Sequence, residues 1–101
     1  MKAAITTFVR KLNTRSFNNN TQKALHRLLT AKGDGWVSLN DFRIPSVGSR
    51  IRDLRKERFG SFDVACRSAS YLERKGGRHT FYYKINQRNL TLGQVKSVFE
   101  I

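Results

Sequence analysis

The sequence SVGSRIRDLR, residues 46–55, carries the pattern from which the rest of the fold is predicted. Its apolar positions recur three or four residues apart, which is the period of an amphipathic helix. That face comprises Val47, Ile51, Leu54 and the stem of Arg58. We expect a helix from Val47 to about Arg58, with Ser46 as its N-cap and the apolar face against a core.

The opposite face of this helix is polar and largely basic. Its members are Ser46, Ser49, Arg50, Arg52, Asp53 and Lys56. Small residues near the start, Gly48 included, allow close approach of the backbone to phosphates or base edges. Arginine offers forked donors to guanine or phosphate. This division into a core stripe and a basic flank is typical of a helix that enters the major groove of DNA.

A second amphipathic helix is expected upstream, starting at Thr21 as N-cap. Its apolar stripe consists of Ala24, Leu25, Leu28 and Leu29. Gly33 suits the left-handed conformation that ends a helix. Trp36 and Val37 follow as a short extended piece. Ser38 is a further cap candidate, opening a short helix that directs Leu39 and Phe42 to one core, and Pro45 then breaks the chain.

Downstream the period changes from that of a helix to that of a strand. Phe62, Val64 and Cys66 alternate with polar or small residues, and residues 80–85 form a second strand rich in aromatic side chains. Gly76 and Gly77 supply a turn between them, so we expect a β-hairpin. The tip is basic and carries Arg74, Lys75, Arg78 and His79.

Several side chains are expected in the core. These are Trp36, Phe42, Phe59, Phe62, Phe81 and Tyr83, while Tyr71 and Tyr82 are expected to be half exposed. Cys66 shares a strand face with Phe62 and Val64, which favours a buried structural thiol over a reactive one.

The chain divides into three segments. Residues 1–20 are an N-terminal arm or docking element, whose apolar side chains fit either a helix or a strand. Residues 21–85 are the expected folded domain. Residues 86–101 are a C-terminal extension with a short amphipathic helix capped by Thr91, which packs on the domain or serves in dimerisation.

The net charge of the chain narrows the classes of partner that it can bind. Lys and Arg number 20 against seven acids, so 101 residues carry a net charge of +13. A field of that sign attracts polyanions, nucleic acid above all, and an acidic protein is the less favoured partner. No apolar run suffices to cross a membrane, and no secretory signal is recognised. The single Cys fits a reducing cytoplasm, and the two His lack metal-ligand spacing.

The order of predicted elements resembles the winged helix-turn-helix domain of small phage and prophage proteins. The resemblance is carried by TQKAL at residues 21–25, by the Arg-Ile-x-x-Leu-Arg pattern within 46–55 and by the aromatic hairpin that includes YYKI at 82–85. Residues 60–63 depart from the pattern, because Gly is followed there by Ser and Phe. The resemblance implies an α+β fold with a three-helix core, a β-hairpin wing and two terminal extensions.

The predicted function is binding of double-stranded DNA, as a transcriptional regulator of a phage or mobile element in the bacterial cytoplasm, at the nucleoid. The helix at 47–58 would occupy the major groove, and the basic hairpin tip would contact the backbone. A homodimer is left open. We expect no cofactor, metal, membrane or small-molecule ligand, and no enzymatic activity. The alternatives are an RNA-binding or ribosome-associated protein, an excisionase-like architectural protein and, less favoured, a small ribonuclease toxin using His26 and His79.

Overall fold

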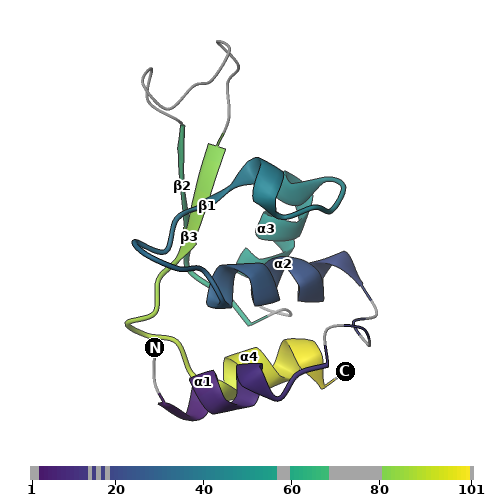
Figure 1. Cartoon of the computed structure of the whole chain (residues 1–101), viewed down its shortest axis with the longest axis vertical. Helices are drawn as coiled ribbons and strands as arrows, with labels where there is room; N and C mark the ends of the chain where they lie inside the picture. Colours follow the sequence, from purple (N-terminus) through teal and green to yellow (C-terminus); the bar gives the residue numbers. More distant parts are fainter. Residues whose placement is uncertain are drawn as a thin grey trace.

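Four α-helices and a three-stranded antiparallel sheet make up the part of the chain that the computed structural model describes (Figure 1). The described residues are 3–13, 15, 17, 19–56, 60–68 and 81–100. The elements follow in the order α1 (Ala3–Arg10), α2 (Asn20–Leu29), β1 (Val37–Ser38), the 3-10 helix η2 (Leu39–Asp41), α3 (Val47–Arg55), β2 (Val64–Ser68), β3 (Phe81–Ile85) and α4 (Leu92–Phe99). The expected α+β class is confirmed.

The sheet has the order β1-β3-β2, so the last strand in sequence lies in the middle. β2 and β3 form the predicted hairpin, in which Val64 faces Ile85 and Ser68 faces Phe81. The short β1 joins the other edge of β3, where Val37 faces Tyr83. Side chains alternate between the two faces of a strand, and the helices α2 and α3 contact β3 and β2 respectively.

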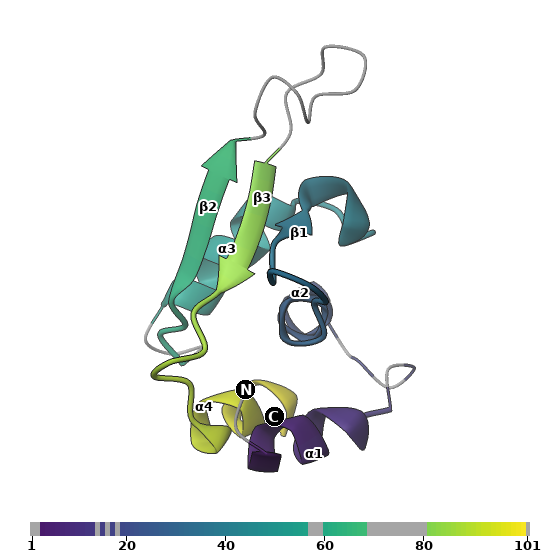
Figure 2. The same cartoon turned by 60° about the vertical axis from the view of Figure 1, so that its left-hand side comes forward.

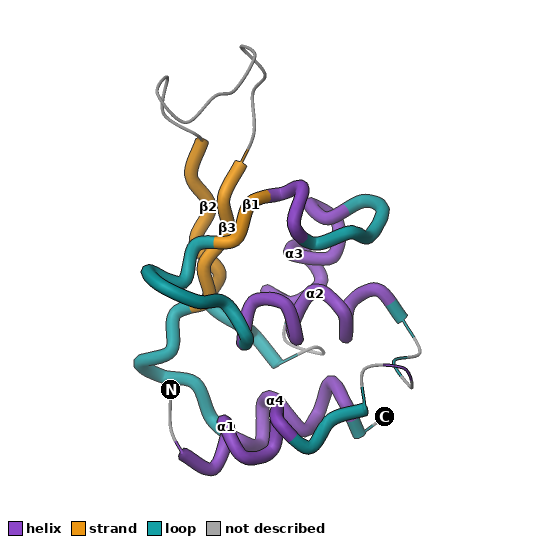
Figure 3. The backbone as a smooth tube through the Cα atoms, in the orientation of Figure 1, coloured by secondary structure: helices purple, strands orange, loops and turns teal. Residues whose placement is uncertain are grey.

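The core lies between the sheet and the helices. α3 is seen behind β2 and β3 in Figure 2, and α1 and α4 lie side by side below α2. Ile5 and Val9 of α1, with Val95 and Val98 of α4, belong to the same buried cluster as Leu25 of α2. The tube in Figure 3 shows the two terminal helices at one end of the molecule and the strands toward the other.

Both terminal segments therefore form part of the packed fold. The N-terminal segment contains a helix rather than a strand, and the C-terminal helix packs on the rest of the fold as expected. Thr91 is the N-cap of α4 and forms a capping box with Gln94, since each side chain bonds the other's backbone amide. Among the described residues, no helix is long and apolar enough to span a membrane.

The start of α2 differs from the prediction. Asn19, not Thr21, is the N-cap, and its Oδ1 accepts a hydrogen bond of 2.9 Å from the amide of Gln22. Thr21 is instead inside the helix and buried. Asn and Thr are both good caps, and here Thr21 is buried within the helix while Asn19 accepts the capping bond.

The expected second helix is reduced to the single turn η2. Ser38 caps it as predicted, with Oγ accepting from the amide of Asn40 at 3.4 Å. Phe42 is buried, and Leu39 packs partly against the core. The chain then reaches α3 through a segment in which Arg43 and Ser46 both have a left-handed backbone, with φ of 54° and 53°. Such conformations are uncommon for residues other than glycine.

The end of α3 was predicted too late. The helix stops at Arg55, and Lys56 is already extended with ψ of 147°, whereas the expected end, Arg58, lies outside the described residues. The amide of Phe62 donates to the carbonyl of Leu54 at 2.8 Å, so the chain folds back and satisfies a carbonyl at the helix end. Gly60, with φ of 107°, makes this reversal in a conformation that favours glycine.

Three side chains predicted to be buried are not. Cys66 is exposed, Phe81 is 40% exposed and Trp36 is half-buried. Cys66 lies on the edge strand β2, while its partner Tyr83 in the central strand is buried. Phe42, Phe62 and Tyr83 are in the core as expected, and Tyr82 is half-buried as expected; Phe59 and Tyr71 lie outside the described residues.

Candidate nucleic-acid interface

The helix α3 separates its side chains into a buried stripe and an open flank. Val47, Ile51 and Leu54 are buried, at a spacing that places them on one face. Arg52 and Lys56 are exposed, and Ser49, Arg50 and Asp53 are half-buried at the borders of that stripe. The flank therefore combines cationic side chains with short ones, a set able to bind phosphates.

Asp53 organises two of these cations. Its Oδ2 lies 3.3 Å from Nη2 of Arg50, and its Oδ1 lies 3.4 Å from Nζ of Lys56. The Arg50 Nε is buried and has no hydrogen-bond partner among the residues that the structure describes. Because Asp53 neutralises part of the local charge, Arg52, for which no such ion pair is seen among the described residues, is the most available cation of the flank.

The N-terminal end of α3 is unusually open. Ser46 occupies the N-cap position, but its left-handed backbone leaves its side chain without the usual bond to a helix amide. A methyl group built at Gly48 would meet no atom within 4 Å, counting the described residues. The first turn thus presents backbone amides beside small side chains, and helix N-termini attract anions through such amides.

Arg55 was not singled out from the sequence, and it has a structural role. Its Nη2 and Nε donate to the carbonyl of Val64 at 2.6 and 3.2 Å. This pair of bonds ties the end of α3 to the start of β2. It fixes the helix relative to the hairpin, so the two parts of the candidate interface keep one geometry.

The outer face of the sheet holds a second basic group that sequence reasoning missed. The guanidinium of Arg67 lies 4.4 Å from the ring centre of Tyr82 and 5.0 Å from that of Trp36. Lys84 Nζ lies 5.9 Å from the same Trp36 ring. In Figure 2 no helix lies in front of these strands. Side chains alternate strictly along β3, so Tyr82 and Lys84 lie on the face opposite Tyr83. This alternation could have predicted the group from the sequence.

This group lies at the base of the predicted wing. Arg67 pairs with Tyr82, one step before the last described pair of the hairpin. The four hairpin-tip residues predicted to contact DNA lie outside the described residues; they are Arg74, Lys75, Arg78 and His79. The other six predicted residues lie on α3 or directly at its ends. They are Ser46, Ser49, Arg50, Arg52, Asp53 and Lys56.

Two titratable side chains among the described residues have shifted pKa values. Burial, followed by the neighbouring Cys66, raises the pKa of the Tyr83 phenol. Burial, followed by the charge of Arg27, lowers the pKa of His26. Among the described residues, no three His, Cys, Asp or Glu side chains are grouped so as to hold a metal ion.

Comparisons with models of known protein families, with curated proteins and with solved structures find no match for this chain. The interpretation of its surface therefore depends on the geometry described above.

Proposed function

We propose that this protein binds double-stranded DNA through the open flank of α3, as a winged-helix regulator of a phage or mobile element. The observation that carries the proposal is the open flank of α3, where the three cations Arg50, Arg52 and Lys56 accompany one acid and short side chains open the first turn. B-DNA has a major groove of about 12 Å, which admits one helix. A helix of nine residues with one buried stripe fits that role.

The order of the elements supports the winged-helix assignment. A helix, a short strand, a helical turn and a second helix precede a hairpin, and the short strand pairs with the second strand of that hairpin. In this arrangement the hairpin loop would contact the DNA backbone beside the recognition helix. Arg67 and Lys84 would extend that contact at the hairpin base, and Arg74, Lys75, Arg78 and His79 would supply it at the tip.

Single-stranded nucleic acid is a second candidate, because Trp36 and Tyr82 lie on an open sheet face beside basic groups. Aromatic platforms of this kind stack unpaired bases. The Arg67 guanidinium, however, already stacks on both rings, so a base would have to displace it. Arg52 on the flank of α3 can meet a duplex without such a displacement, and duplex binding is the function we favour.

The test is fluorescence anisotropy with a labelled duplex at moderate salt, compared with its separate strands. The variant pair Arg52→Gln and Lys56→Gln should weaken duplex binding about tenfold or more without changing the melting temperature. Lys11→Gln with Arg88→Gln removes the same charge from exposed positions elsewhere and should have a much smaller effect. Equal losses from both pairs, or tighter binding to single strands, would contradict the proposal.

A further inference from the structure

A pocket of about 440 Å³ lies between α2 and the segment that follows η2. Three cationic side chains border it, Lys23 and Arg27 from α2 and Arg43 from the segment. Phe17 and Phe42 add phenyl rings from different parts of the chain, and the remaining lining residues are His26, Asp41 and Ile44. The volume falls within the range of about 300–1,000 Å³ that small-molecule sites occupy.

The walls of this pocket are held by contacts of their own. Arg27 Nε donates to the carbonyl of Asp41 at 3.3 Å, which connects α2 to the end of η2. The Phe17 ring stacks edge-on against His26, with ring centres 5.2 Å apart, and also lies 5.3 Å from the Phe99 ring. Phe42 is buried beneath the pocket and stacks edge-on with Tyr83 at 5.8 Å. These contacts hold the end of η2, the Phe17 ring and the Phe42 ring in place around the pocket.

The charge of the lining selects an anion. Asp41 is the one acid among the described lining residues, against three permanent cations in the same lining. Desolvation by burial, and then Arg27, lowers the pKa of His26, so at neutral pH this imidazole is uncharged. It then presents one donor and one acceptor rather than a fourth positive charge.

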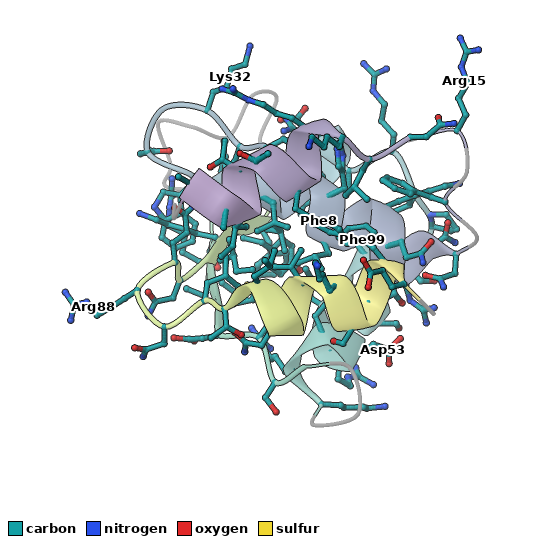
Figure 4. The ribbon with its side chains drawn as sticks, turned by 90° about the horizontal axis from the view of Figure 1, so that it is seen from below. Phe8, Arg15, Lys32, Asp53, Arg88 and Phe99 are labelled. Atoms are coloured by element: carbon teal, nitrogen blue, oxygen red, sulfur yellow. The ribbon has the colours of Figure 1, made fainter. Side chains whose placement is uncertain are left out.

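The pocket adjoins the segment that leads into α3, because Arg43 and Ile44 line both this pocket and a neighbouring hollow with Ser46 and Val47. In Figure 4, Asp53 of α3 lies at the opposite side of the view from Arg15 and Lys32. The pocket includes Phe17, two residues beyond Arg15, and Arg27, which also borders a hollow with Lys32. The pocket thus extends from that side of the molecule to the segment that leads into α3.

We propose that the pocket binds a single nucleotide. Its phosphate would lie among Lys23, Arg27 and Arg43, and its base would lie against the Phe17 ring. Several cations converging on one site suit a doubly charged phosphate better than a single carboxylate, since guanidinium groups bind phosphate through paired hydrogen bonds. An aromatic wall next to them suits a planar base. This departs from the expectation of no small-molecule ligand, and it does not depend on the proposed DNA binding.

Isothermal titration calorimetry of the full chain tests the proposal with adenosine 5′-monophosphate, adenosine and inorganic phosphate. We expect one molecule of the monophosphate to bind per chain, at least tenfold more tightly than adenosine or phosphate alone, because each of these makes only part of the contacts. Phosphate binding as tightly as the nucleotide would reveal mere attraction to charge and overturn the proposal. Adenosine binding equally tightly would overturn the assigned phosphate site, and so would a lack of nucleotide binding at millimolar concentration.

Two matched pairs of variants locate the site. Lys23→Gln with Arg43→Gln should weaken nucleotide binding about tenfold or more, since charged hydrogen bonds to the phosphate are lost. Both side chains are exposed, and glutamine, unbranched at Cβ like arginine, should tolerate the left-handed backbone at position 43 equally well, so the fold should be retained. Lys11→Gln with Arg88→Gln should leave the affinity within twofold. Equal losses from the two pairs would place the nucleotide elsewhere and refute the assignment.

Discussion

The helices α2 and α3 have nearly the same length and pack against each other, yet they use their side chains differently. α2 buries six of its ten residues, including Thr21 and Gln22, and it contacts α3, α4 and β3. α3 buries three of its nine and leaves the rest of its circumference half-buried or exposed. This difference shows that α2 holds the fold together, whereas α3 packs on the core with one face and leaves its other face open to solvent.

The strongest test of this comparison removes a core side chain from α2. Leu25 is fully buried, so Leu25→Ala should lower the free energy of unfolding by about 2–5 kcal/mol through lost burial and a cavity. Arg52→Ala, on the exposed flank of α3, should change it by no more than about 0.5 kcal/mol. Urea denaturation followed by circular dichroism measures both. Similar losses in the two variants would break the proposed division between the helices.

A smaller effect is expected from a buried polar contact that connects α2 to α4. Gln22 Nε2 donates to the carbonyl of Val98 at 3.0 Å inside the core. Gln22→Ala leaves that buried carbonyl without this donor and should cost about 1–3 kcal/mol. Lys23→Ala, the exposed neighbour on the same helix, is the control in the same denaturation experiment. A Gln22 variant as stable as the Lys23 variant would show that this bond is unimportant.

Gly48 on α3 should give effects of opposite sign on folding and on binding. Alanine meets no atom there and favours the helix, so Gly48→Ala should stabilise the fold by up to about 1 kcal/mol. The added methyl lies where we propose that the first turn approaches DNA, so duplex affinity should fall. Melting temperature and anisotropy are measured on the same sample. A gain in stability with unchanged duplex affinity would show that this turn is not part of the interface.

The smallest expected effect concerns pH. Burial, and then the charge of Arg27, lower the pKa of His26 in the folded protein, whereas in the unfolded chain a histidine accepts a proton near pH 6.5. The unfolded state thus binds more protons below that pH, and stability falls as the pH drops through 6.5. Between pH 7.5 and 5.5 the melting temperature of His26→Gln should decline less than that of the original protein. Parallel declines would exclude His26 as the cause.

Local patterns were sufficient for elements with a strong apolar period or a clear cap. The stripe of Val47, Ile51 and Leu54 predicted α3, and Thr91 predicted the start of α4. Alternation around Val64 and Tyr83 predicted the hairpin, since both side chains face the core. These features depend on residues close in sequence, so their spacing can be recognised without knowledge of the rest of the molecule.

Features set by distant contacts were not predictable in the same way. The end of α3 depends on the bond from Phe62 to Leu54 and on the Arg55 contact with Val64. The exposure of Cys66 goes with its place in an edge strand, which the pairing of the three strands decides. In the candidate interface, the outward direction of Arg52 followed from helical spacing, whereas the stacking of Arg67 on Trp36 required the pairing of three strands.

The most direct test of the central claim is a map of backbone amide shifts by NMR spectroscopy as a duplex is added to the labelled protein. The account predicts that the largest changes fall on α3 and its start, at Gly48, Ser49, Arg52 and Lys56, with smaller ones at Arg67 and Lys84. Changes concentrated instead on α1 and α4, with α3 unaffected, would contradict it.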